Sequence, residues 1–176
     1  MARILIVDDA EQNLLLYELY LKGDEFEVST AGGGKEALDA VAKGDFDLIL
    51  LDVVMPEMDG IEVCRRLQAS ARTASIPVIF FTGRLKDSSD RQVAYDAGAV
   101  DYLTKPIEKQ ELVARIRVML RFRQERSRLE AENAELAEAV RKIKSVSLGA
   151  SEELEDRRAL LNARTGGEGA TMILDG

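Results

Sequence analysis

Residues 47–60 read DLILLDVVMPEMDG, and this stretch decides the fold of the 176-residue chain. Four consecutive aliphatic residues, 48–51, are followed at once by the carboxylate of Asp52. A short strand that is apolar throughout is typical of a parallel sheet, because helices cover both of its faces. The stretch therefore predicts a buried central strand that ends at Asp52.

Four further runs are rich in β-branched and aliphatic residues and are short enough to be strands. They lie at residues 3–7, 26–30, 77–81 and 100–103, on either side of the central run at 47–51. Segments with helical periodicity separate them, and strands that alternate with helices need crossover connections. We therefore predict an α/β domain over residues 1–120, a (βα)5 doubly wound fold with a five-stranded parallel sheet.

Each of the five helical segments carries apolar residues at the spacing of a helix with one apolar stripe. These residues are Leu14, Leu15, Leu19 and Leu21, then Ala37, Leu38 and Val41, then Ile61, Val63 and Leu67, then Val93 and Ala94, and finally Leu112, Ile116 and Met119.

The fifth helix is predicted to continue past the domain, because residues 108–147 contain neither proline nor glycine. A seven-residue register runs along it, which is typical of a coiled coil. One core position holds Leu112, Met119, Arg126, Asn133, Val140 and Ser147, and the other holds Arg115, Phe122, Leu129, Leu136 and Ile143. We predict a coiled-coil extension over 121–148, continuous with the last helix of the domain.

Gly149 is predicted to interrupt this helix, and Ser151 to begin a new one that ends near residue 164. The segment 149–176 would then be a short helix followed by a disordered, glycine-rich tail.

Composition excludes several classes of function. The chain has no histidine, which removes Ser/His and Cys/His nucleophilic sites and a phosphohistidine within these residues. A net charge of -8 argues against direct nucleic-acid binding. The single cysteine, Cys64, and the lack of a long apolar run argue against an oxidising compartment and a membrane span. We expect a cytoplasmic protein.

Polar residues follow the predicted strands where ligands bind in open parallel sheets, at the carboxyl ends. Asp8 and Asp9 end the first strand, Asp52 the third and Thr82 the fourth, and Lys105 follows the fifth. Three neighbouring carboxylates repel one another unless a cation compensates them. Because Mg²⁺ prefers oxygen ligands, the pattern predicts a magnesium site.

Four motifs in order, ILIVDD at 4–9, LILLDVVMPEMDG at 48–60, IPVIFFTG at 76–83 and DYLTKP at 101–106, resemble the bacterial two-component response-regulator receiver family. The resemblance covers about two-thirds of the chain and implies the flavodoxin-like receiver fold. It also implies that a sensor histidine kinase or a histidine phosphotransfer protein donates a phosphoryl group to Asp52.

The resemblance further implies how the site is divided among its residues. Asp9 and Asp52 would bind Mg²⁺ directly, Asp8 would act through a metal-bound water, and the backbone carbonyl of Val54 would complete the protein ligands. Lys105 would pair with the phosphoryl group. The bond from Lys105 to the following proline is expected to be cis, as X-Pro bonds can be.

Thr82 and Tyr102 resemble the switch pair of the family. Once Asp52 is phosphorylated, the Thr82 hydroxyl would bond a phosphoryl oxygen and the Tyr102 ring would move into the vacated space. Val54 and Arg84 flank the expected phosphate position and are predicted to tune hydrolysis.

Output is expected through protein contacts, with an unidentified protein effector and a parallel homodimer along residues 120–147, in which Asn133 fixes the register. An alternative is the receiver and linker of a larger regulator, such as a diguanylate cyclase. A phosphohydrolase with an aspartyl-phosphate intermediate is disfavoured, because its second aspartate would stand where this chain has Val54. We therefore expect no enzyme beyond self-phosphorylation and dephosphorylation.

Overall fold

The computed structural model describes residues 1–23, 25–83, 92–93 and 95–165, apart from the side chains of 146–152 and 163–165. The chain forms two compact units, Met1–Arg126 and Ser127–Gly176. The first holds the sheet, and within the described residues the second is helical. The helices of the described part include none with the length and apolar character of a membrane-spanning segment.

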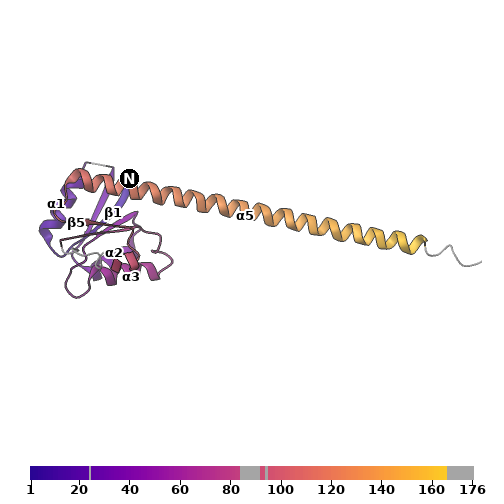
Figure 1. Cartoon of the computed structure of the whole chain (residues 1–176), viewed down its shortest axis with the longest axis horizontal. Coiled ribbons are helices and arrows are strands. Elements are labelled where there is room, and N and C mark those ends of the chain that lie inside the picture. Colours follow the sequence, from indigo (N-terminus) through magenta and orange to yellow (C-terminus); the bar gives the residue numbers. More distant parts are fainter. Residues whose placement is uncertain (24, 84–91, 94, 166–176) are drawn as a thin grey trace, which may run out of the picture. The chain divides into compact units, whose positions relative to one another are not determined.

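Five parallel strands form one sheet, in the order β2-β1-β3-β4-β5. The predicted doubly wound fold is confirmed (Figure 1). The strands are β1 (Ala2–Val7), β2 (Phe26–Ala31), β3 (Leu48–Leu51), β4 (Val78–Thr82) and β5 (Asp101–Thr104). All four residues of β3 and all five of β4 are buried, as central strands covered on both faces must be.

Helices cover the sheet on both sides, and the side chains of each strand alternate between two cores. On one side, α1 (Glu11–Leu21) and the first turns of α5 (Lys109–Thr165) pack on Ile6, Leu50 and Phe81. On the other side, α2 (Gly34–Lys43) and α3 (Gly60–Ala69) pack on Val7, Leu51 and Phe80. Figure 1 shows the two pairs of helices on opposite sides of the strands.

The apolar stripe predicted for α1 is partly wrong. Leu15 and Leu19 are 61% and 64% exposed, whereas Tyr17 and Leu21 are buried. The inner face of α1 follows Asn13, Tyr17 and Leu21, each four residues after the last. A polar residue therefore occupies the turn nearest the strand ends, and the leucine spacing could not reveal this.

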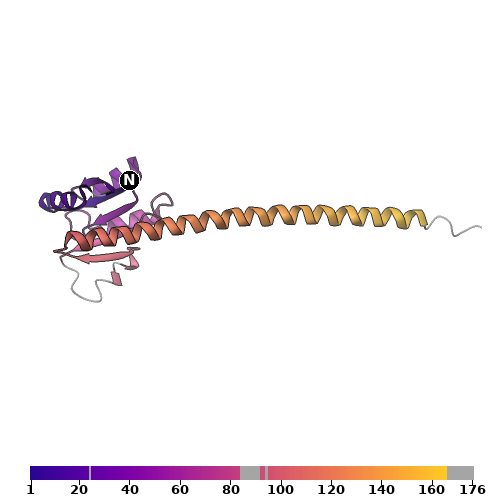
Figure 2. The same cartoon turned by 90° about the horizontal axis from the view of Figure 1, so that it is seen from above.

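The predicted break at Gly149 is also wrong. α5 runs as one helix from Lys109 to Thr165 (Figure 2). A glycine inside a helix costs only about 1 kcal/mol relative to alanine, which a run of good helix formers can absorb. The seven-residue register cannot begin at Leu112 as predicted. Leu112 is fully buried in the core of the sheet unit and so cannot lie in a seam with another helix.

Several predictions fall outside the described residues. They concern Ala94, Arg84, the side chains of Ser147 and Ser151, and the tail at 166–176. Of the predicted fourth helix, residues 92–93 and 95–96 are described and are helical.

Candidate functional site

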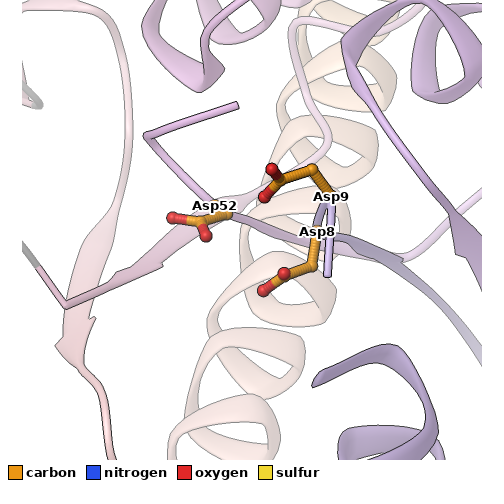
Figure 3. A group of neighbouring side chains, drawn as sticks. All are labelled: Asp8, Asp9 and Asp52. Atoms are coloured by element: carbon orange, nitrogen blue, oxygen red, sulfur yellow. The ribbon is translucent and has the colours of Figure 1, made fainter. Parts of the chain in front are cut away.

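Three carboxylates meet at the carboxyl edge of the sheet. Asp8 and Asp9 follow β1, and Asp52 follows the neighbouring strand β3 (Figure 3). One oxygen of each carboxylate lies within 4.8 Å of the others. Asp8 is fully buried and Asp52 is 8% exposed, while Asp9 is exposed. The three predicted ligand side chains are therefore brought together.

The loop after β3 holds Asp52 in place through backbone contacts. The Asp52 N–H donates to the Val7 carbonyl at 2.9 Å, which locks the start of the loop onto β1. A Cβ at Gly60 would lie 2.1 Å from the Asp52 carbonyl oxygen, so only glycine fits there. Asp59 then caps α3, since its side chain accepts from the Glu62 N–H at 2.8 Å. Asp59 and Gly60, the last two residues of MPEMDG, thus help to fix the position of Asp52.

Lys105 is the cation that compensates this acidic cluster in the structure. Its Nζ donates to Asp8 Oδ2 at 2.5 Å and to Asp52 Oδ2 at 2.6 Å. The Lys105 side chain is only 16% exposed, so these ion pairs are partly shielded from solvent. The same Nζ lies 4.4 Å from the centroid of the Phe81 ring. The expected cis bond between Lys105 and Pro106 is confirmed.

Asn13 was missed by the sequence prediction, yet it contacts the most buried carboxylate of the site. Its Nδ2 lies 2.9 Å from Asp8 Oδ1 and 3.1 Å from Asp8 Oδ2. Asp8 Oδ1 also accepts from the Ala10 N–H at 2.9 Å, and Oδ2 from Lys105. A carboxylate offers about four lone-pair positions, and these contacts use them all. The position of Asn13 in the first turn of the helix that follows β1 was the available signal.

Two aromatic side chains, Tyr17 and Phe81, lie beside the carboxylates and Lys105. The rings of Tyr17 and Phe81 meet edge to face, with centroids 4.9 Å apart. Burial, followed by the charge of Asp8, raises the pKa of the Tyr17 hydroxyl to about 12. Tyr17 therefore stays neutral beside the carboxylates. The Lys105 ammonium makes a cation–π contact with the face of the Phe81 ring.

The two residues of the predicted switch pair lie on neighbouring strands. Thr82 ends β4 and is 1% exposed, and its carbonyl accepts from the Lys105 N–H at 3.1 Å. Tyr102 in β5 is half-buried and packs against the core on the side of α2 and α3. Its ring lies 6.2 Å from that of Tyr95 in an edge-to-face arrangement. Tyr95 is 46% exposed, so this aromatic pair reaches the surface.

Val54 lies at the mouth of the site. Its side chain is 42% exposed, and its N–H donates to Asp52 Oδ1 at 3.3 Å. The oxygen-only donor set of the cluster suits a hard divalent cation. One exposed carboxylate, Asp9, beside two buried ones leaves such an ion access from solvent.

Comparison with known proteins agrees with this geometry. The family model "Response regulator receiver domain" matches residues 4–117. The response regulator PleD of Caulobacter vibrioides is 48% identical over 122 residues, which cover 69% of this chain and 27% of that protein. The response regulator ArlR of Staphylococcus saprophyticus is 41% identical, with 69% of this chain and 53% of that protein covered.

A crystal structure of a putative response regulator from Chloroflexus aurantiacus is 38% identical, with a TM-score of 0.64 over 68% of this chain and 97% of that one. The chain spans about a quarter of PleD and about half of ArlR. The order of the motifs, the sheet topology and the family match agree, and the chain belongs to the response regulator receiver domain family.

Proposed function

We propose that Asp52 accepts a phosphoryl group from a histidine kinase or a histidine phosphotransfer protein. The observation that carries the proposal is the position of this carboxylate. It is held at the end of a central strand, 2.6 Å from Lys105 Nζ and beside two further carboxylates. The 176 residues contain no histidine, so the donor imidazole must come from outside them.

In the proposed reaction a carboxylate oxygen of Asp52 attacks the phosphorus in line with the leaving imidazole. The bond from phosphorus to the donor nitrogen breaks, and an acyl phosphate forms on Asp52. The electron pair of that bond stays on the imidazole, which can then take up a proton. Lys105 would then turn toward the phosphoryl group, because its ammonium can pair with a phosphoryl oxygen once Asp52 is phosphorylated.

A divalent cation, which we propose to be Mg²⁺, would be held by Asp9 and Asp52 and by the carbonyl of Val54. Bound there, it would offset the negative charge that the phosphoryl oxygens bring to the cluster. Asp8 would contact the ion through water. The hydrogen bonds that Asp8 accepts from Asn13 and from the Ala10 N–H support this division, since they already use much of its capacity as an acceptor.

For the switch we propose that the Thr82 hydroxyl turns to the phosphoryl group and that Tyr102 moves inward. The position of Tyr102 supports this, because its half-buried ring packs at the edge of the core and can move further inward. Because the Tyr102 ring contacts Tyr95, its movement would change the exposed surface around Tyr95. We further propose that Val54 tunes hydrolysis from the mouth of the site.

For output we propose a homodimer along residues 120–147 and an unidentified protein effector, with no turnover of external phosphoesters. The buried, free Cys64 is compatible with the cytoplasmic location that we propose. A second candidate is the receiver portion of a larger regulator, which is favoured by the greater length of the relatives.

The proposal is tested by incubating the chain with acetyl phosphate and Mg²⁺ and measuring the intact mass. Wild type should gain one phosphoryl group, and Asp52→Asn should gain none. Asp156→Asn is a matched control, because this exposed carboxylate lies in the other unit, and it should behave as wild type. EDTA should prevent the gain. Phosphorylation of Asp52→Asn at the wild-type rate would contradict the proposal.

A further inference from the structure

We propose that a second copy of this chain pairs in parallel along α5 not only over residues 120–147 but as far as Leu161. The inference rests on the proposed dimer and extends its interface beyond Gly149. It assigns a partner to a helical surface that the sequence pattern had placed outside the coiled coil.

The first observation is the unbroken helix. Because α5 continues to Thr165, the seven-residue register that places Val140 in the seam also places Leu154 and Leu161 there, fourteen and twenty-one residues later. Gly149 falls two positions after Ser147, at a position of the heptad that points away from a partner helix. It therefore weakens the helix without interrupting the seam.

The second observation is the exposure of the apolar side chains along this line. Leu154 and Leu161 are 67% and 63% exposed, much like Leu136 at 64% and Ile143 at 68%. Burial of these leucine and isoleucine side chains would be favourable, because it removes apolar surface from water. The exposed i,i+4 ion pairs of the helix contribute little by comparison. A partner helix supplies the missing burial.

The polar residues of the seam favour two identical chains in parallel. In that arrangement Asn133 faces Asn133 of the second copy, so the two amides can bond to each other. Glu153 then faces Arg158 of the second copy across the flank of the seam. The antiparallel alignment with the longest overlap would instead place Glu132 against Glu153, while the seam arginines meet one another in either arrangement.

Arginines at core positions of the seam also limit the affinity of the dimer. Arg126 and Arg157 occupy core positions, and in parallel each meets its own copy. Glu125 precedes Arg126 and can offset its charge across the seam, whereas Arg157 must turn its guanidinium to solvent. We therefore expect a reversible dimer with a dissociation constant on the order of tens of micromolar.

The test is disulfide trapping in the full chain. Leu136→Cys, Leu161→Cys and Ala159→Cys are oxidised mildly, and two thiols on opposite copies form a disulfide as the oxidant takes two electrons. The native thiol can remain, because Cys64 is fully buried and burial raises its pKa to about 11. Ala159 lies at the outermost position of the heptad and is the matched control. Far-ultraviolet circular dichroism of the reduced variants checks that each keeps its helix.

We expect Leu136→Cys and Leu161→Cys to form linked dimers on the order of tenfold faster than Ala159→Cys, because seam positions approach within disulfide reach. Equal rates for Leu161→Cys and Ala159→Cys would overturn the inference. If Leu136→Cys alone is trapped, the seam ends early, so the extension is overturned and the dimer is retained. If neither is trapped, both are overturned, while phosphoryl transfer to Asp52 stands on its own assay.

Discussion

The sheet unit and the helix beyond it use apolar residues in opposite ways. In Met1–Arg126 most aliphatic residues of the strands are buried, and both cores close within one chain. In Ser127–Gly176 every side chain that the structure describes is exposed, the leucines included. The first unit can therefore hold a site in fixed geometry by itself. The second exposes an apolar stripe along its described residues, which we propose a second copy of the chain covers.

The difference between the two units is tested most directly by making the same leucine-to-alanine substitution in each. Leu50→Ala removes a fully buried side chain and should lower the free energy of unfolding by about 2–5 kcal/mol. Leu136→Ala, at 64% exposure, should change the unfolding of the sheet unit by less than about 0.5 kcal/mol. Urea unfolding followed by tyrosine fluorescence, which reports on the sheet unit, measures both. Equal losses would mean that the two units are not independent.

Removing the cation at the strand ends should have the next largest effect. Lys105→Met removes the ion pairs that Asp8 and Asp52 make with this ammonium, and the incoming phosphoryl group would lose its pairing with Lys105. We expect the rate of labelling by acetyl phosphate to fall about 100-fold. Lys109→Met, at the exposed start of α5, is the control. A fall in both variants, or in neither, would remove Lys105 from the mechanism.

A smaller effect is expected from the amide that positions Asp8. Asn13→Ala removes two hydrogen bonds from this buried carboxylate and frees it to turn. The Mg²⁺ concentration for half-maximal labelling should rise about 10-fold, as for other groups that orient metal ligands, with the maximal rate kept. Gln12→Ala, exposed on the same helix, should match wild type. A lower maximal rate at unchanged Mg²⁺ dependence would speak for a merely structural role.

The smallest effect concerns Asp47, which contacts α5 close to the boundary between the units. Burial by itself would raise its pKa, but hydrogen bonds from the Arg3 N–H and the Arg123 guanidinium lower the pKa below its ordinary value. The folded state therefore binds the proton more weakly than the unfolded state. This contribution is complete above the unfolded pKa of about 3.9 and is lost as the pH falls through the folded pKa.

Asp47→Asn should accordingly cost about 1 kcal/mol at neutral pH, because the side chain is partly exposed. The difference between variant and wild type should shrink as the pH is lowered below about 4. Urea midpoints across this range measure it. A constant difference at all pH values would show that the carboxylate charge plays no part.

Much of the sheet unit could be predicted from sequence because strand and helix periods differ and four of the five strand ends carry a polar group of the site. Residues 48–51, followed by Asp52, contained both the central strand and the acceptor. Contacts between distant residues could not be predicted in the same way. Nothing in the spacing shows that Lys105 bridges Asp8 and Asp52, because ninety-seven residues separate the first pair.

Two of the wrong predictions share a physical origin. Residue spacing predicted Leu15 and Leu19 on the apolar stripe of α1, and low helix propensity predicted that Gly149 ends a helix. Both predictions used local sequence alone. In the structure the turn facing the strand ends holds the polar Asn13, and a single glycine does not outweigh the good helix formers around it. Local pattern is a weak guide where a site or a long helix sets the context.

The most direct test of the account is to locate the phosphoryl group. Wild-type chain labelled with acetyl phosphate and Mg²⁺ is reduced with borohydride, which converts an aspartyl phosphate to homoserine, and the peptides are sequenced by mass spectrometry. The account predicts homoserine at position 52, with Asp8 and Asp9 intact. Homoserine at position 8 or 9, or labelled protein without homoserine at position 52, would contradict it.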